Sequence, residues 1–582
     1  MNKNGLNFKR RKANTGNIIR DTLINHGVDD FDSYRDISNV GVTFTDPSNI
    51  FNMDKAFKRI EESFDEDERI GILVDGDADG FASASLLYKG ILDMNPDANV
   101  NLIVPDTKSH GLGIMMQTIL WEKYDLVITP DASSNDKEQH KQLKNVGIDV
   151  IVLDHHIINE PKLYTPAIIV NNQSEENLMT NKNFVGVGMS FMFMKYVAQE
   201  TSYKDYINID DYLPLLAFGQ ITDMSNVAEP EIRYYVQKGI SLFNEHKFLS
   251  LFSEFDKSVH MVSFKIAPLV NSVARIGTLD ERKSLLMAMS EHMSDEKNEV
   301  IKRRKSRKTG LMENRVFMLN EYQIEQDTLT GIKKRQDNTV KKAVDELEYL
   351  SKKEDGIIIA KIPSDISSSI TGLIAGRIMG NNQSPVLVVK ESNNVFTGSM
   401  RCPTSFELRS WLNETGLVKA SGHEQASGVE FSPNNIEELL EKTKNELNVV
   451  QDYISVDELY DEYNTSQAPI RLVNESISLF GGAVKEPEIG YTALPVKKTS
   501  IHQRGKVVSF SYNGLNFILF SGTDLMSYVQ KETGFNSVIY IDVLGSAAKN
   551  DWGDGSPQVI IRDIAITKQN KSVPESPEDY IF

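Results

Sequence analysis

The chain has 582 residues, too many for one ordinary domain, and this length suggests about three or four domains. Its 40% hydrophobic and 25% charged residues are normal for a soluble globular protein, and no run approaches the roughly 18 apolar residues of a membrane helix. The basic N-terminus lacks the apolar core of a secretory signal, and the single cysteine, Cys402, excludes an internal disulfide. We therefore expect a cytoplasmic protein with no membrane partner.

The net charge of −19 bears on the kind of partner that the protein binds. A protein that coats nucleic acid by electrostatics alone is usually basic. An acidic chain still acts on a polyanion where metal ions carry the positive charge at the reacting phosphate. The acidity thus argues against non-specific coating and is compatible with a metal-dependent nuclease.

Residues 1–66 are predicted to be a polar, partly helical lead-in with a basic cluster at Lys9–Lys12. This cluster indicates either an interaction arm or a disordered tail. A first α/β domain is predicted over 67–280, where short apolar runs alternate with helical stretches, as in a doubly wound parallel sheet. The apolar runs expected to be strands lie at 70–74, 126–129, 150–153 and 168–170.

The charged, helix-favouring sequence over 281–355 predicts a helical connector. Its basic run at 302–308 is either a solvated helix face or a nucleic-acid contact. A second, glycine-rich α/β domain is predicted over 356–452, with apolar strands at 356–360 and 385–389.

Residues 453–582 contain short apolar strands separated by turn residues. This spacing is typical of a small antiparallel barrel or sandwich.

Acidic and histidine side chains directly follow three of the apolar runs in the first domain. They are Asp75, Asp77 and Asp79 after the first run, Asp131 after the second, and Asp154, His155 and His156 after the third. Because the ends of neighbouring parallel strands meet at the crevice where ligands bind, these side chains are expected to lie together. Asp223, after a further apolar stretch at 213–218, is a candidate to complete the set.

So many carboxylates at close range cannot all stay ionised without a counter-charge, which divalent cations supply. An oxygen-rich set with imidazole suits Mn²⁺ or Mg²⁺ better than zinc, and one cysteine excludes a thiolate-rich site. Two such ions about 3.5–4 Å apart would clamp a phosphate, activate a water and stabilise the leaving oxygen. The sequence therefore predicts a two-metal phosphodiesterase.

A calcium-binding EF-hand loop is the structural alternative for the Asp-rich segment. That loop requires Glu at its twelfth position. Counted from Asp75, the twelfth residue is Leu86, so the alternative fails.

These residues resemble the motifs of the DHH phosphoesterase superfamily, and within it of the RecJ-type single-strand DNA exonucleases. Val74–Gly80 resembles the first motif, Asp131 the second, Asp154–His156 the third and Asp223 the fourth. The resemblance covers nearly the whole chain. It implies a DHH parallel-sheet domain, a helical connector, a DHHA1 α/β domain over 356–452 and a C-terminal OB-like β-barrel.

The resemblance also implies a role for each residue in the first domain. His156 would lie near the scissile phosphate, Asp154 would orient the site, and Arg275 would contact phosphate as a bidentate cation. Asp131 would bridge the two ions. The metal-site residues would be Asp75, Asp77, Asp79, Asp131, His155 and Asp223.

In the second domain, Gly398–Arg401 and the segment around Gly422 resemble DHHA1 motifs. The resemblance implies that Ser399 and Arg401 recognise a phosphate at the 5′ end of the strand. It also implies that the strand passes Gly422 and that His423 reaches into the cleft. Ordinary tight turns are the alternative for the glycines.

The chain departs from the family's pattern at three positions. Ala274 and Ser421 stand where relatives often have Gly, and Thr107 stands where RecJ-type enzymes tend to have Arg. Lys108 or His110 would then take over 5′-phosphate recognition.

The segment Asn550–Gly555 and the strand after it resemble the last hairpin of the RecJ OB-fold. OB-folds bind single strands through a cationic groove and stacked aromatic rings. The candidate contacts are Lys497, Lys498, Arg504, Lys506, Tyr512 and Trp552. For Trp552, packing in the core or at an edge is the alternative.

The function that the resemblance implies is exonucleolytic degradation of single-stranded DNA, 5′→3′, to 5′-mononucleotides. It would use two divalent ions, Mn²⁺ preferred or Mg²⁺, in DNA recombination, repair or phage DNA metabolism. Candidate partners besides single-stranded DNA are a single-strand-binding protein and a helicase.

Two alternatives remain open from the sequence. One is a DHH nanoRNase or cyclic-dinucleotide phosphodiesterase acting on short substrates. The other is a catalytically inactive scaffold. The connector and the OB-like tail favour the exonuclease over the first, and the full set of ligand positions favours it over the second.

Overall fold

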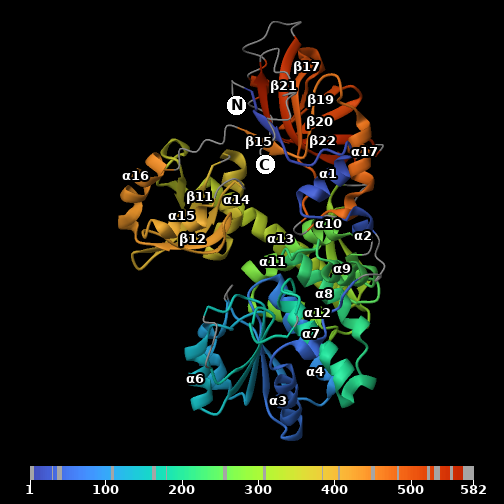
Figure 1. Cartoon of the computed structure of the whole chain (residues 1–582), viewed down its shortest axis with the longest axis vertical. Helices are drawn as coiled ribbons and strands as arrows, with labels where there is room; N and C mark the ends of the chain where they lie inside the picture. Colours follow the sequence, from blue (N-terminus) through green and yellow to red (C-terminus); the bar gives the residue numbers. More distant parts are fainter. Residues whose placement is uncertain are drawn as a thin grey trace.

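The computed structural model arranges the chain as three lobes (Figure 1). It describes residues 5–28, 30–35, 42–106, 110–159, 165–178, 180–252, 258–305, 310–382, 384–403, 407–446, 453–481, 484–520, 525–527, 529, 538–550 and 555–567. Within these ranges, no helix combines the length and the apolar character needed to cross a membrane.

The first lobe, at the bottom of Figure 1, is built on a parallel sheet with strand order β3-β2-β4-β5-β6. The strands are β2 (Ile70–Leu73), β3 (Val100–Ile103), β4 (Leu126–Pro130), β5 (Asp149–Asp154) and β6 (Ile168–Asn171). The four predicted strands are confirmed. The sequence did not predict β3, where Asn99 and Asn101 interrupt the apolar pattern.

Helices cover both faces of this sheet, which confirms the doubly wound prediction. Alternate side chains of a strand point to opposite faces, so Ile72 and Ile128 join one core and Leu73 and Val127 join another. The first core is shared with α3 (Met53–Asp65), α4 (Ala78–Met94) and α7 (Gly186–Glu200), and the second with α5 (Met116–Glu122) and α6 (Lys137–Asn145).

A helical layer completes the first lobe. It contains α8 (Leu213–Thr222), α9 (Pro230–Ser241), α10 (Val259–Met261), α11 (Ala267–Ile276) and α12 (Leu279–Met289). The apolar stretch before Asp223 is thus a buried helix, α8. A π-helical turn over Val262–Ile266 joins α10 directly to α11.

The predicted helical connector over 281–355 is formed by helices, and it also contains a β-hairpin that the sequence did not predict. Antiparallel strands β7 (Asn298–Lys305) and β8 (Met312–Leu319) precede the long helix α13 (Glu321–Asp345). The β-branched residues Ile301 and Val316 are paired across the two strands, and such pairs favour sheet over helix.

The basic run therefore begins on a strand and does not form a helix face. Lys302 and Arg304 of β7 both form ion pairs with Asp327 of α13, the second at 3.6 Å. Residues 306–309 lie outside the described residues.

The second lobe is an α/β unit with strand order β13-β14-β12-β11-β10-β9, which confirms the predicted fold class. Only β10 and β11 are parallel to each other. The strands are β9 (Glu348–Tyr349), β10 (Ile358–Lys361), β11 (Val386–Ser392), β12 (Val395–Arg401), β13 (Lys419–His423) and β14 (Ala426–Phe431). Separate cores on its two faces hold α14 (Thr371–Asn382) on one side and α15 (Leu408–Glu414) and α16 (Ile436–Glu446) on the other.

The third lobe, at the top of Figure 1, has the strand order β16-β17-β21-β22-β20-β19-β18. The strands are β16 (Glu458–Tyr460), β17 (Ile489–Lys497), β18 (His502–Arg504), β19 (Val507–Tyr512), β20 (Leu515–Leu519), β21 (Val538–Lys549) and β22 (Pro557–Thr567). The prediction of an antiparallel sheet was wrong for two pairs, because β16–β17 and β20–β22 are parallel. A closed barrel is not confirmed, since no pairing joins β16 to β18 within the described ranges.

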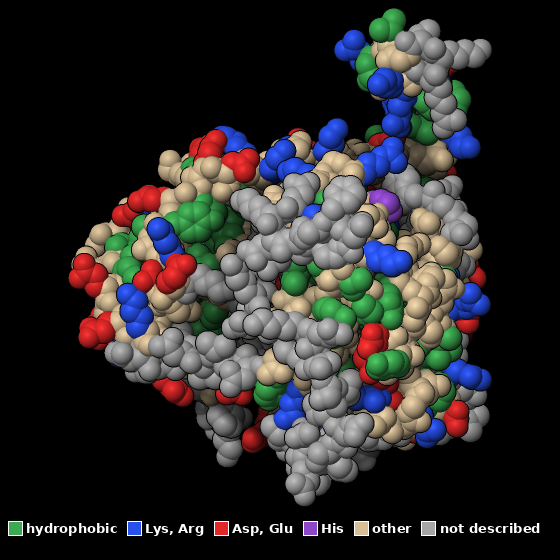
Figure 2. All heavy atoms as spheres, turned by 90° about the horizontal axis from the view of Figure 1, so that it is seen from above, with side chains coloured by type: hydrophobic (Ala, Val, Ile, Leu, Met, Phe, Trp, Pro, Cys, Tyr) green, Lys and Arg blue, Asp and Glu red, His purple; other side chains and the backbone are tan. Residues whose placement is uncertain are grey.

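The basic candidates of the third lobe lie on one continuous stretch, from Lys497 at the end of β17 to Lys506 before β19. Tyr512 lies at the far end of β19, where its hydroxyl donates to the Glu462 carbonyl at 2.9 Å. Seen from above, basic and acidic side chains are interspersed over the described surface (Figure 2). No single basic face is visible from that side.

The basic cluster of the lead-in is ordered in the structure, so the alternative of a disordered tail was wrong for Lys9, Arg10 and Arg11. Strand β1 (Phe8–Arg10) runs parallel to β15 (Ile454–Val456) beside the third lobe. Arg10 pairs with Asp21 and Glu458, and Arg11 pairs with Asp457 and Glu488.

Helices α1 (Ile18–Asn25), α2 (Phe31–Arg35) and α3 follow β1. Buried residues of this lead-in, of the first lobe, of α17 (Gln467–Glu475) and of the third lobe form one continuous hydrophobic core.

Candidate metal centre

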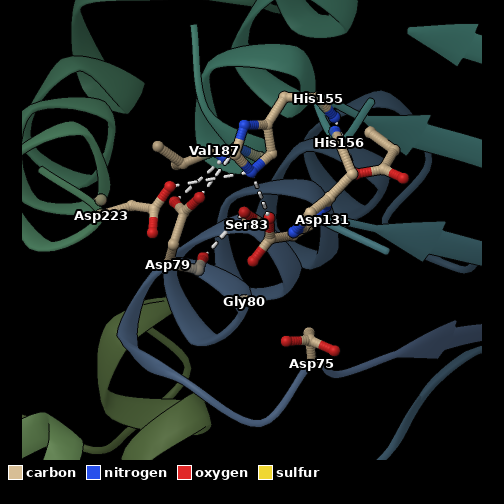
Figure 3. Close-up of polar contacts among 12 residues, drawn as sticks. Asp75, Asp79, Gly80, Ser83, Asp131, His155, His156, Val187 and Asp223 are labelled. Atoms are coloured by element: carbon tan, nitrogen blue, oxygen red, sulfur yellow. Dashed lines mark hydrogen bonds and ion pairs between the residues drawn. The ribbon is translucent and has the colours of Figure 1, made fainter. Parts of the chain in front are cut away.

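The carboxyl ends of β2, β4 and β5 lie side by side and bring three aspartates together, two of which, Asp75 and Asp131, are labelled in Figure 3. Asp75, Asp131 and Asp154 are all buried. Asp131 has a left-handed backbone, φ 64°, and its N–H donates to the Leu153 carbonyl at 2.9 Å. A left-handed aspartate is uncommon and marks a sharp turn, here directly out of β4.

Two further aspartates lie at the N-terminus of α4. Asp77 is its N-cap and accepts hydrogen bonds from the N–H groups of Asp79 and Gly80, both at 3.1 Å. The Asp79 carboxylate accepts from the N–H groups of Gly186 and Val187 at 2.8 and 3.1 Å. Asp79 thus satisfies unpaired N–H groups at the start of α7 while it lies in the first turn of α4.

Glycine at 186 is required by close packing against Asp131. A Cβ atom at this position would lie 2.3 Å from both Cβ and Oδ1 of Asp131. The same kind of approach occurs at Gly80, where a Cβ would lie 2.5 Å from Asp75 Cβ. Glycine at the start of α7 therefore lets the helix pack directly against the aspartate.

His155 lies between two of the carboxylates. Its Nε2 atom is 3.2 Å from Asp131 Oδ1 and 3.8 Å from Asp223 Oδ2. Asp223 caps the C-terminus of α8, and the next residue, Met224, has φ 57°. The structure thus brings Asp223 to the strand ends, as the sequence predicted.

His110 is a further residue of this centre. Its Nδ1 atom lies 2.6 Å from Asp75 Oδ2. The sequence pointed to His110 only as an alternative phosphate contact. The signal that would have placed it here is the strand β3, which precedes it and pairs with β2.

The carboxylates of the centre have raised pKa values. Burial and the charge of Asp223 raise the pKa of Asp79, and burial and the charge of Asp79 raise the pKa of Asp131. Burial also raises the pKa of Asp75, although the hydrogen bond with His110 opposes this, and it raises the pKa of Asp223 to about 7. The cluster therefore lacks positive charge when all its members are ionised.

The donor set fits divalent cations. The possible ligand atoms form three groups, and inside each group the atoms lie within 4.8 Å of one another. The groups are Asp79, His155 and Asp223; Asp75, Asp77 and His110; and Asp131, Asp154, His155 and His156. Asp75 Oδ1 is buried and accepts no hydrogen bond from the residues that the structure describes. Buried polar atoms are rarely left without a partner, so this oxygen is suited to a cation. Carboxylate oxygens with imidazole suit Mn²⁺ or Mg²⁺.

Asp154 has a different environment from the other aspartates. It accepts hydrogen bonds from the N–H groups of Ser134, His155 and His156 and from His156 Nδ1, the last at 2.8 Å. Burial alone would raise the pKa of Asp154, but its histidine neighbours hold the pKa below the usual range. The hydrogen bond to Asp154 raises the pKa of His156 to about 9, while burial lowers the pKa of His155 to about 4.

Arg275 of α11 lies between the metal centre and the second lobe. Burial and the nearby charge of Arg401 lower the pKa of Arg275, and Asp77 opposes that shift. The Arg275 carbonyl accepts from Ser369 Oγ of the second lobe at 2.7 Å. Among the described residues, no carboxylate forms an ion pair with either arginine, and burial also lowers the pKa of Arg401.

The second lobe presents Ser399 and Arg401 from the same strand, β12. Ser399 Oγ lies 2.9 Å from Thr371 Oγ1 at the start of α14. Arg401 packs over Gly372, where a Cβ would lie 2.7 Å from Nη2. Two arginines without carboxylate partners, together with hydroxyls, form a suitable environment for a phosphate.

The remaining candidate substrate contacts are Gly422, His423, Lys108 and Trp552. Gly422 lies in β13 opposite Ser427 with φ 126°, a conformation that favours glycine. The backbone of His423 belongs to β13, but its side chain is not among those described. Lys108 and Trp552 lie outside the described residues.

Comparison with known proteins defines the class of the first lobe. Residues 69–220 match the family model described as the DHH family, N-terminal domain. The first lobe is therefore a DHH-family domain, as its motifs suggested.

The likeness extends well beyond that domain. The chain is 27% identical over 579 residues to the putative SPbeta prophage-derived single-strand DNA-specific exonuclease YorK of Bacillus subtilis (strain 168), covering 95% of this chain and 96% of the relative. It is 24% identical over 590 residues to the single-stranded-DNA-specific exonuclease RecJ of the same organism, covering 95% of this chain and 68% of the relative.

Among solved structures, the crystal structure of RecJ in complex with Mn²⁺ from Thermus thermophilus matches with a TM-score of 0.66 at 18% identity. The match covers 96% of this chain and 76% of that chain. The fold is thus RecJ-like over nearly the whole chain.

Proposed function

We propose that this protein is a metal-dependent exonuclease that degrades single-stranded DNA. The observation that carries the proposal is the meeting of Asp75, Asp131, His155 and Asp223 at the strand ends, with an unpartnered carboxylate oxygen and raised pKa values. Relatives named as single-strand DNA-specific exonucleases match 95% of the chain, which supports the same substrate for it.

Two divalent cations would be held by the carboxylates and His155. The proposed ligands are Asp75, Asp77, Asp79, Asp131, His155 and Asp223. Solved RecJ structures from Thermus thermophilus hold Mn²⁺ or Mg²⁺, which supports these ions as the cofactors. When bound, the cations would supply Lewis-acid stabilisation of the phosphate and lower the pKa of a water.

The protein's own groups would orient the scissile phosphate. Asp154 fixes the His156 ring through Nδ1, which leaves Nε2 to donate to a phosphate oxygen. With a pKa of about 9, His156 is protonated at neutral pH and adds positive charge. Arg275 would bind a second phosphate oxygen as a bidentate donor.

We propose that the enzyme acts from the 5′ end and releases 5′-mononucleotides. Ser399 and Arg401 would bind the terminal 5′-phosphate, with Gly422 and His423 beside the strand and Lys108 as a further contact. The proximity of Arg401 to Arg275 supports this arrangement. Trp552 is proposed to contact the strand in the third lobe.

The proposed domain boundaries are 1–66, 67–280, 281–355, 356–452 and 453–582. A cytoplasmic location, a role in recombination, repair or phage DNA metabolism, and binding to a single-strand-binding protein or a helicase belong to the same proposal.

The test is digestion of 5′-labelled and 3′-labelled single strands with Mn²⁺, with Asp131→Ala as the control. We expect the wild-type protein to release the 5′ label early and Asp131→Ala to release neither label. Activity that persists in Asp131→Ala would refute the metal assignment, and earlier release of the 3′ label would refute the polarity. A dinucleotide hydrolysed faster than a long strand would favour the short-substrate phosphodiesterase.

A further inference from the structure

A cavity is lined by residues of both the first and the third lobe. Its volume is about 360 Å³, within the range of small-ligand sites. One wall is the π-helical turn Val262–Ile266, and the opposite wall comes from the segment before β17 and from Arg562 of β22. Met224 also lines it. The cavity is therefore lined by the residue that follows a proposed metal ligand, Asp223, in the sequence.

Phe264 presents an exposed aromatic ring on the wall formed by this turn. Phe264 is 64% exposed, although its neighbours Val262 and Ile266 in the same turn are fully buried. π-helical turns are common at functional sites, and here the turn carries Phe264 outward. The ring contacts His260 with centroids 4.7 Å apart, and His260 Nε2 lies 2.8 Å from Glu486 Oε1, which fixes its position. A rigid exposed aromatic surface is suited to stacking.

Polar groups around the ring suit a nucleotide. Glu488 also lines the cavity, but its negative charge is already paired with Arg11 at 2.7 Å and with Arg562 at 3.3 Å. Lys485 also lines the cavity, and within the described ranges it has no ion-pair partner. Ser263 Oγ is buried and has no hydrogen-bond partner among the described residues. The ring of Phe264 is thus surrounded by a hydroxyl suited to hydrogen-bond the edge of a base and by cations suited to bind a phosphate.

We propose that this cavity is a nucleobase-binding subsite for the single strand, in which a base stacks on Phe264 and the adjoining phosphate lies near Lys485 and Arg562. The inference rests on the proposed function for the nature of its occupant, a single strand of DNA. A base held there makes the enzyme prefer strands long enough to reach the third lobe. Stacking of this kind changes Kd by about 5- to 150-fold per base.

The test measures binding without hydrolysis. Fluorescence anisotropy with a 3′-labelled oligothymidylate of about 20 nucleotides in EDTA gives the Kd of the wild type, Phe264→Ala, Phe264→Leu and Phe264→Trp. We expect Kd to rise at least about fivefold in the Ala and Leu variants and to stay near the wild-type value in Phe264→Trp. Bound strand should also quench the indole emission that Phe264→Trp adds. Tyr206→Ala, which removes another exposed aromatic ring of the first lobe, is the matched control.

A strand of the same length with abasic sites separates stacking from a merely structural role. Phe264→Ala should then cause no further loss, because no base remains to stack. The proposal is overturned if Phe264→Ala binds oligothymidylate like the wild type, as it would if the cavity received a protein segment. Equal weakening on both strands also overturns it. If instead the wild type releases no nucleotide with Mn²⁺ while these binding differences hold, the proposed function fails and the subsite stands.

Discussion

Gly186→Ala tests whether the close approach of α7 to Asp131 sets the geometry of the metal centre. The new Cβ would lie 2.3 Å from Asp131 Cβ and Oδ1, where ordinary contacts begin at 3.4 Å, so the aspartate or the helix must move by about 1 Å. Metal ligands tolerate deviations of about 0.2 Å, and a 1 Å misplacement at an active site costs roughly 100-fold in rate. We therefore expect exonuclease activity to fall at least about 100-fold, with weaker Mn²⁺ binding.

The control is Gly188→Ala, two positions further into the first turn of the same helix. Its Cβ would lie 2.6 Å from Gln220 Nε2 and 2.7 Å from Phe184 Cδ1, so the overpacking is similar but does not involve a proposed ligand. Both variants should lose about 1–3 kcal/mol of stability.

The assay compares release of nucleotides, Mn²⁺ affinity by titration calorimetry, and thermal unfolding for the two variants. The reasoning predicts similar unfolding temperatures but a large difference in Mn²⁺ affinity. Equal Mn²⁺ affinity in Gly186→Ala and Gly188→Ala would show that the packing does not set the site.

Three further predictions concern charge. Asp131→Asn should raise the unfolding temperature of the metal-free protein at about pH 8, because burial raises the pKa of Asp131 and makes its ionised form unfavourable in the folded state. Mn²⁺ should stabilise this variant less than it stabilises the wild type. Equal stabilisation of the two proteins by Mn²⁺ would count against the proposed site. His110→Ala should weaken Mn²⁺ binding about 10-fold or more by titration calorimetry, since it removes the 2.6 Å contact to Asp75, whereas His502→Ala, on an exposed strand, should not. Burial raises the pKa of Glu458 to about 7, so the folded state binds the proton more tightly than the unfolded state, and stability should fall as pH rises from about 4.5 to 7. Glu458→Gln should flatten that slope in denaturant titrations, and an unchanged slope would contradict the assignment.

The strand ends of the first lobe were predictable because buried parallel strands are almost entirely apolar, so the acidic residues that follow them stand out. The same logic failed for β3, because its sequence alternates apolar residues with asparagine at 99 and 101. Without β3, nothing in the sequence placed His110 beside Asp75.

Other features depend on distant partners that a linear pattern does not reveal. Arg10 and Arg11 belong to an exposed-looking basic cluster, yet their partners Glu458 and Asp457 lie 448 and 446 residues away in the chain. In the connector, the cross-strand pair Ile301–Val316 outweighs the helix-favouring charged residues around it. The exposure of Phe264 depends on the π-helical turn. The extra residue of such a turn is not recognisable from the amino-acid composition of the segment.

The single core that unites the lead-in, the first lobe and the third lobe has a consequence for how the protein unfolds. Segments from the two ends of the chain share one core and are expected to unfold together, whereas the second lobe has two cores of its own. Substitutions in the third lobe therefore lower the stability of the metal centre even where they touch no ligand. Since the second lobe is built on these separate cores, we expect it to unfold locally without loss of the first core, so that Arg401 is displaced while the candidate metal ligands stay in place.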